Sequence, residues 1–172
     1  MCLTYNHNLT KELQARTEKF TAYKIYYVGK SGIEENVIRR MLSPFRINDK
    51  SARIVEPGTY ESSEIGFTAG AINPLLPRTT IGPPDIEHDK MQLDISGFHS
   101  FLSRIGAKMY FIHNRYTNAN FQIVEVTIDP QDIVAAGLTL DFDYSTETVV
   151  STKITVSKEE FDKIPYNCAE YI

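Results

Sequence analysis

Cysteine, long apolar runs and clusters of one charge are all scarce in this sequence. Its two cysteines, Cys2 and Cys168, are too few for a disulfide framework and lack the spacing of a zinc site, which indicates reduced thiols. No apolar run approaches the ~20 residues of a membrane helix, and the first residues lack the basic and apolar regions of a signal peptide. We therefore expect a cytoplasmic protein without a membrane partner.

Basic residues are not gathered into one region either. The chain has 18 Lys and Arg residues against 22 Asp and Glu residues, a net charge of −4, and the cations stand in ones and twos. A nucleic-acid-binding surface needs grouped cations, because neutralising several phosphates together releases their counterions. Nucleic acid is therefore not an expected partner.

The rest of the composition is that of an ordinary globular protein. The 172 residues are 42% hydrophobic and 23% charged, which predicts a single domain over residues 1–172. Alternating and helical periods together predict an α+β fold, a mainly antiparallel twisted sheet braced by two or three short helices. Strands are predicted over residues 22–28, 98–102, 121–128, 138–144 and 149–156, and helices over residues 9–20, after Ser103, over 129–137 and after Ser157.

Two segments resist a regular assignment. Residues 31–53 fit a short helix or a loop, because a helical period there is cut by Pro44. Residues 73–85, NPLLPRTTIGPPD, hold four prolines and a glycine, which predicts a long loop without regular structure over most of its length. Such loops are often lids or binding loops. The alternative is an exposed insertion.

The segment SGFHSFLSRIGAKMYFIH, from Ser96 to His113, carries the main candidate site. A strand leads into a helix near Ser103, which is a plausible N-cap, and Gly106 either weakens this helix or permits close packing on the sheet. His99 lies where the strand ends, a position from which side chains often reach a ligand. A histidine between aromatic residues is also typical of a hydrogen-bonded core, so both interpretations stay open.

The order of these segments resembles that of small uncharacterised phage and bacterial proteins. The shared features are the Met-Cys-Leu start, the GFHSF segment before a helix, IVEVTIDPQDIVAAG, and STKITVSKEEF. This resemblance implies a shared fold and brings no activity with it.

A weaker resemblance is to ADP-ribosyltransferase-like folds, in which a strand leads into a tyrosine-bearing helix that helps to hold NAD. His99 and Tyr110 match those positions. The family has an arginine or histidine on its first strand, where this chain offers Lys24, and a late-strand glutamate, for which Glu125 and Glu147 are the candidates. The resemblance implies NAD as the ligand of such an enzyme, but the missing first-strand Arg or His removes the strongest diphosphate partner.

Three functional hypotheses follow. The favoured one is binding of a small nucleotide-like ligand, with His99, Tyr110, Phe101, Lys24 and Glu125 as the ligand-binding candidates and no cofactor or catalytic residue assigned. The first alternative is an ADP-ribosyltransferase-like enzyme. The second is a protein-interaction module that binds a host or partner protein through the 73–85 loop, and a homo-oligomer is compatible with each of them.

Further reactive side chains have ordinary explanations. The acids and histidine of 87–89, with Asp85 and Asp94, lack a recognised ligand spacing, so no metal is predicted. Asp141 and Asp143 share one strand face and are either paired carboxylates or a solvated face. Cys2 would become an N-terminal nucleophile if Met1 were removed, or it is a small residue near a terminus.

Overall fold

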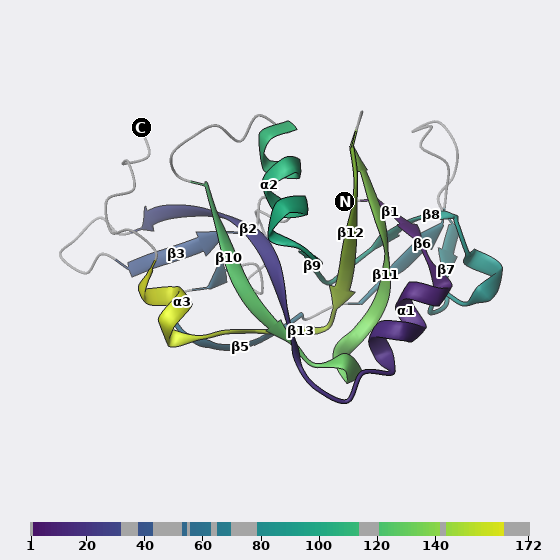
Figure 1. Cartoon of the computed structure of the whole chain (residues 1–172), viewed down its shortest axis with the longest axis horizontal. Helices are drawn as coiled ribbons and strands as arrows, with labels where there is room; N and C mark the ends of the chain where they lie inside the picture. The colour runs from purple at the N-terminus through teal and green to yellow at the C-terminus, as the bar shows by residue number, and fades with distance from the viewer. Residues whose placement is uncertain are drawn as a thin grey trace.

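The protein is an open, antiparallel sheet with three short α-helices (Figure 1), which confirms the predicted α+β fold. It is a computed structural model that describes residues 2–31, 38–42, 53–54, 56–62, 65–69, 79–113, 121–141 and 144–163. The strands are β1 Cys2–Tyr5, β2 Phe20–Ser31, β3 Ile38–Leu42, β4 Arg53–Ile54, β5 Gly58–Glu61, β6 Phe67–Ala69, β7 Thr79–Ile81, β8 Gln92–Ile95, β9 Phe98–Phe101, β10 Phe121–Ile128, β11 Ile133–Asp141, β12 Tyr144–Ser151 and β13 Lys153–Val156. The helices are α1 His7–Gln14, α2 Arg104–His113 and α3 Lys158–Asp162, with single 3-10 turns η2 Ile86–His88 and η3 Pro130–Asp132.

The strand order is β5-β13-β10-β2-β9-β12-β11-β1-β8-β6-β7, and β3 branches from β2 and pairs with β4 on its other side. Residues far apart in the sequence are therefore neighbours. β1 lies inside the sheet, where Leu3 is opposite Thr139 of β11 on one side and Leu93 of β8 on the other. In Figure 1, α3 lies near one end of the sheet, α1 near the other and α2 above its middle.

Alternation along β2 separates two apolar clusters. Ala22 and Tyr26 point into the main core, which Leu13 of α1 helps to fill. Ile25 points the other way, into a small cluster that α2 covers through Ala107. The helices therefore cover apolar faces of the sheet, as predicted. No helix in the described part of the chain is long and apolar enough to span a membrane.

Predictions that rest on local signals are confirmed. β10 has the predicted bounds, and β9 leads into α2 as expected. The Gly106 N–H donates to Ser103 Oγ at 3.0 Å, so Ser103 caps α2. The Glu160 N–H donates to Ser157 Oγ at 3.1 Å, so Ser157 caps α3.

Several predicted boundaries are wrong. The first helix is His7–Gln14 instead of 9–20, because the Asn6 side chain accepts from the Leu9 N–H and starts the helix earlier, whereas Phe20 belongs to β2. Asp129 caps a helical turn as predicted, but the turn ends at Asp132 and 133–137 continue as β11. Thr152 separates β12 from β13, which were predicted as one strand.

Strands also occupy segments predicted otherwise. Ile38–Leu42, where a helix or loop was expected, is β3 and pairs with β2. Thr79–Ile81, inside the predicted 73–85 loop, is β7 and pairs with β6. Residues 73–78, Asp143 and Cys168 lie outside the described residues.

Gly106 permits close packing of α2 on the sheet, which is one of the two roles that the sequence left open for it. A Cβ at this position would lie 2.1 Å from Thr146 Oγ1 of β12. We expect Gly106→Ala to lower the free energy of unfolding by about 2 kcal/mol. In an exposed helix without close neighbours, the same change would raise the free energy of unfolding by as much as about 1 kcal/mol. Urea denaturation measures the difference.

The double variant Gly106→Ala/Thr146→Ala supplies the control. It removes the clashing hydroxyl and leaves the Thr146 Cβ position at 3.3 Å from the new methyl group. Most of the lost stability should return. A single variant as stable as the parent protein would contradict the packing argument.

Candidate functional site

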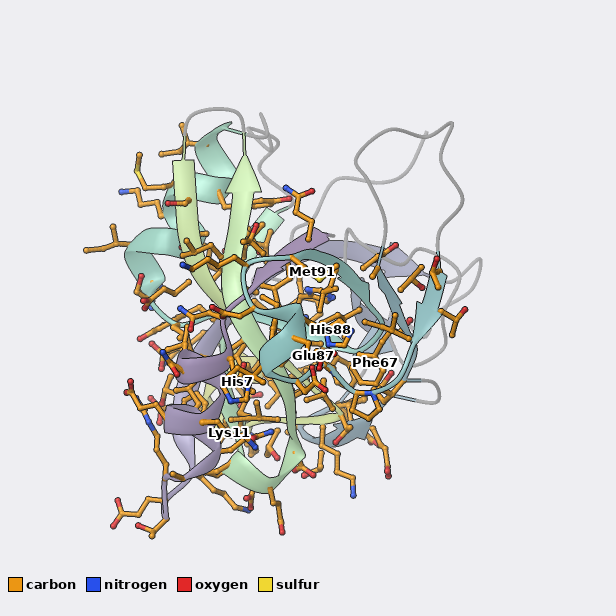
Figure 2. The ribbon with its side chains drawn as sticks, turned by 90° about the vertical axis from the view of Figure 1, so that its right-hand side faces the viewer. His7, Lys11, Phe67, Glu87, His88 and Met91 are labelled. Atoms are coloured by element: carbon orange, nitrogen blue, oxygen red, sulfur yellow. The ribbon has the colours of Figure 1, made fainter. Side chains whose placement is uncertain are left out.

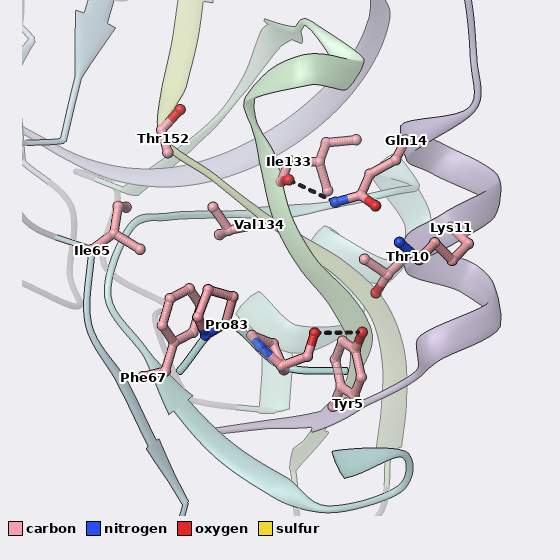
Figure 3. Close-up of a pocket in the computed structure, with 11 residues that line it drawn as sticks. Tyr5, Thr10, Lys11, Gln14, Ile65, Phe67, Pro83, Ile133, Val134 and Thr152 are labelled. Carbon is pink, nitrogen blue, oxygen red and sulfur yellow. Dashed lines mark hydrogen bonds between the residues drawn. The ribbon is translucent and has the colours of Figure 1, made fainter. Parts of the chain in front are cut away.

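A cavity of about 500 Å³ lies between α1 and the end of the proline-rich segment (Figure 3). Its walls come from parts of the chain that are far apart in the sequence and are mostly apolar. The residues that line it are Tyr5, Thr10, Lys11, Gln14, Ile65, Phe67, Pro83, Pro84, Ile133, Val134 and Thr152. This size, and walls that are largely apolar with a few polar groups, are typical of small-molecule sites.

The α1 wall is fixed to β11 by hydrogen bonds. Thr10 Oγ1 donates to the Asn6 carbonyl at 2.8 Å and accepts from the Ala136 N–H at 2.9 Å. Because its hydroxyl is engaged, Thr10 contributes an apolar methyl group to the cavity. Gln14 Nε2 donates to the Ile133 carbonyl at 3.0 Å, which leaves the amide oxygen of Gln14 as an acceptor at the cavity.

The opposite wall is held by Tyr5. Its hydroxyl donates to the Pro84 carbonyl at 3.3 Å and lies 3.4 Å from His7 Nδ1. Burial raises the pKa of Tyr5, opposed by a hydrogen bond with Thr10 and reinforced by the charges of Asp85 and Asp89. The phenol is therefore neutral at physiological pH and acts as a donor that fixes the proline wall.

The turn after Pro84 carries the acids and histidine that were considered for a metal. Figure 2 faces this turn. Asp85 Oδ1 accepts from the Glu87 N–H at 3.0 Å and lies 2.8 Å from His88 Nδ1, and this contact with His88 lowers the pKa of Asp85. Asp89 Oδ1 accepts from the His7 N–H at 2.9 Å. These side chains therefore stabilise the turn, and the described residues contain no group of three or more His, Cys, Asp or Glu side chains suited to a metal ion.

A smaller polar pocket of about 210 Å³ lies at another part of the sheet. It is lined mainly by threonines and charged groups, and two of its lysines already have carboxylate partners. Lys19 Nζ lies 3.6 Å from Asp129 Oδ2. Lys153 Nζ lies 3.5 Å from Glu61 Oε1. The lining of this pocket is mostly polar, with Ile154 as an apolar member, so the larger and mostly apolar cavity is the better candidate.

The candidate residues His99 and Lys24 lie in the interior. His99 is 6% exposed, and its Nε2 lies 2.7 Å from the Ile95 carbonyl. Lys24 is 3% exposed, and its Nζ donates to the His99 carbonyl at 2.6 Å. Burial lowers the pKa of Lys24 to about 7. The two residues thus meet through a backbone oxygen.

The other three candidates lie on the α2 side of the sheet. Phe101 is fully buried, and the Tyr110 ring packs on it with centroids 5.1 Å apart. Glu125 is partly exposed and accepts from Arg104 at 3.2 Å. The two pockets above, which are formed by described residues, include none of the five candidates. A ligand site around His99 and Tyr110 stays a prediction.

The sequence indicated one wall of the cavity and missed the other. Pro83 and Pro84 lie in the 73–85 segment, which was predicted as a long loop that is either a binding loop or an exposed insertion. Tyr5, Lys11 and Gln14 were not singled out, and no local pattern marks them, since β1 and α1 reach the cavity only through pairing with β11. Comparison of the chain with protein-family models, curated proteins and solved structures gives no match.

Proposed function

We propose that the cavity between α1 and Pro83–Pro84 binds a small ligand with a flat apolar ring and one anionic group, the chemistry of a mononucleotide. The observation that carries the proposal is an apolar cavity of about 500 Å³ with Lys11 as the only charged side chain among the described residues that line it. Apolar walls favour the ring by removing its surface from water. A lysine at the rim favours an anion as a point charge.

The charges around the cavity favour one orientation of such a ligand. The Lys11 side chain extends from α1 toward the cavity in Figure 3. At the other side, burial raises the pKa of Tyr5, and the negative charges of Asp85 and Asp89 raise it further. An anionic group is therefore stabilised beside α1 and repelled near Tyr5, so the ring belongs beside Phe67 and Pro83.

The polar groups of the cavity are few and defined. Thr10 and Tyr5 use their hydroxyl groups on backbone partners, as described above. The carbonyl oxygen of Gln14 is left to accept from an amino or hydroxyl group of a ligand. Among the described residues, Thr152 Oγ1 makes long contacts of 3.4 Å to the carbonyl and to a carboxylate oxygen of Asp132, so this hydroxyl can turn toward a ligand. One acceptor, one hydroxyl and one cation suit a small polar heterocycle.

The first test is a titration of the full-length chain with adenosine 5′-monophosphate, GMP, UMP and the matching nucleosides, followed by calorimetry and thermal shift. We expect a nucleotide to bind more tightly than its nucleoside, and Lys11→Gln to weaken nucleotide binding about tenfold while leaving nucleoside binding unchanged. Ligand at about 100 times its Kd should add about 2.7 kcal/mol to the free energy of unfolding.

Two further variants test whether the ligand binds in this cavity. Val134→Phe adds a ring in the cavity and should abolish binding of nucleotides and nucleosides alike. Arg16→Gln removes an exposed cation that lies just after α1 and pairs with Glu12 at 3.7 Å, and it should change the binding of neither nucleotides nor nucleosides. Binding that survives Val134→Phe would exclude this cavity.

The same titration distinguishes the alternatives. Including NAD and following its loss by chromatography tests the ADP-ribosyltransferase hypothesis. Binding that is lost in Tyr110→Phe and kept in Val134→Phe would favour the site around His99 and Tyr110. A folded chain that binds none of these compounds would contradict the proposal.

A further inference from the structure

Large apolar side chains are exposed at two places in the described part of the chain. Ile105 and Ile112 of α2 are 76% and 50% exposed. Ile86 and Met91, on the turn formed by residues 85–91, are 69% and 41% exposed. Single exposed apolar residues are ordinary on protein surfaces, whereas contiguous apolar patches rimmed by polar residues mark interaction sites.

The α2 residues form one face of the helix. Ile105 and Ile112 are seven residues apart, two helical turns, so they lie on the same side. Ala107 and Tyr110 pack toward the sheet, which leaves the two isoleucines on the outer face. A helix that braces a sheet normally carries polar residues there. We call Ile105, Ile112 and the cations beside them the α2 patch.

The rim of the α2 patch is basic. Arg104 and Lys108 are exposed, and the sequence of α2, RIGAKMYFIH, contains no acidic residue. Arg104 lies 3.2 Å from Glu125, which partly neutralises it. Lys108 has no carboxylate within ion-pair distance among the described residues. The patch therefore presents two isoleucines and a positive charge.

The turn at 85–91 has the opposite charge. Its backbone is closed by a hydrogen bond from the Met91 N–H to the His88 carbonyl at 3.0 Å. Asp85 and Glu87 are exposed beside Ile86, and a carboxylate is favoured at Asp85 because the His88 contact lowers its pKa. Lys90 is exposed there too, so Asp85, Glu87 and Lys90 together carry a net charge of −1. We call this surface the acidic turn.

We infer that copies of this chain associate head to tail, with the α2 patch of one copy on the acidic turn of the next. Each surface offers two apolar side chains and a rim whose charge complements the other. Burying the four side chains together removes their apolar surface from water, and the pairing of opposite rims selects the orientation. The inference is independent of the proposed ligand site.

The two surfaces lie on different parts of the molecule. α2 projects from the middle of the sheet in Figure 1, whereas Glu87, His88 and Met91 lie on the side that faces the viewer in Figure 2. Each copy therefore keeps one unused surface after pairing, so the contact generates a ring or an open chain of copies. Because each contact is small, association should be weak and depend on concentration.

Sedimentation velocity of the full chain, from micromolar to millimolar concentration, tests the inference. The parent protein should form dimers and larger species as concentration rises. Ile105→Asp and Ile86→Asp should each be monomeric throughout. Mixed in equal amounts, the two variants should form dimers and nothing larger, because each variant keeps the surface that the other lacks.

Charge reversal supplies a second measurement. Lys108→Glu and Glu87→Lys should each weaken association about tenfold, and the two changes combined in one chain should restore it to within about twofold. Gln131→Glu adds an exposed negative charge elsewhere and should leave association unchanged. A parent protein that is monomeric at millimolar concentration would overturn the inference, as would an Ile86→Asp variant that still associates alone.

Discussion

Replacing Gly137 with alanine should lower the free energy of unfolding by about 3 kcal/mol, the largest loss that we expect from a single methyl group in this chain. Gly137 lies in β11, opposite Tyr5 of β1 and Thr148 of β12. A Cβ there would lie 2.0 Å from the carbonyl oxygen of Thr4. Backbone atoms of a strand paired on both sides cannot move away as a side chain can, so β1 or β11 must shift.

Gly82→Ala is the matched control for Gly137→Ala. A Cβ at Gly82 would have no heavy atom within 4 Å, so this change should leave stability nearly unchanged or raise it slightly. Urea denaturation of both variants gives the comparison. An equal effect of the two substitutions would show that the close approach of β1 to Gly137 is not the cause.

Replacing Lys24 with methionine should raise the free energy of unfolding at pH 7 by about 2 kcal/mol. It should also remove most of the rise in stability with pH that we expect for the parent protein. Lys24 Nζ lies 5.6 Å from the centroids of the Tyr26 and Phe98 rings and donates to the His99 carbonyl. Burial in these surroundings disfavours the charged ammonium and lowers the pKa of Lys24 from 10.5 to about 7. Methionine has a similar volume to lysine but cannot donate the hydrogen bond to the His99 carbonyl. The gain in stability is therefore smaller than the cost of burying the charged ammonium.

The sign of the pH dependence follows from the proton counts. Between about pH 7 and 10.5 the unfolded chain binds a proton at Lys24 that the folded chain has mostly released. Stability of the parent protein should therefore rise with pH in this window, by at most about 1.4 kcal/mol per unit. Tyr5 and Tyr26 have raised pKa values because they are buried, so stability should fall again at pH values above about 10.

Denaturation between about pH 7 and pH 9.5 separates the lysine from the tyrosines. Lys19→Met, at a side chain that is 65% exposed, is the control and should keep the slope of the parent protein. A Lys24→Met variant that is less stable at pH 7, or that keeps the parent slope, would show that the buried amine does not destabilise the fold.

Elements with strong local signals could be predicted, and elements defined by distant partners could not. β10 is rich in β-branched residues and ends at the Asp129 cap, so its bounds follow from its own sequence. DIVAAG, from Asp132 to Gly137, has the alanines of a helix, yet Ala135 and Ala136 are fully buried in β11 between β1 and β12. Helix propensity there is overridden by two neighbours that no local pattern reveals.

The same limit applies to the candidate site. His99 and Tyr110 lie in a segment whose pattern changes clearly from strand to helix, so the sequence indicated them as site candidates. The cavity joins Tyr5 and Gln14 to Val134, residues brought together by the pairing of β1 with β11. Only its Pro83–Pro84 wall has a local signature, because adjacent prolines exclude regular structure.

The position of β1 between β8 and β11 has a consequence for synthesis on the ribosome. Leu3 pairs with Leu93 and Thr139, so β1 leaves the exit tunnel well before its partners and can complete its pairing only after Thr139 has been translated. β2 likewise waits for β10. Pairings of this sequence separation make nucleation slow, and the unpaired nascent strands would offer apolar segments to chaperones before the sheet can assemble.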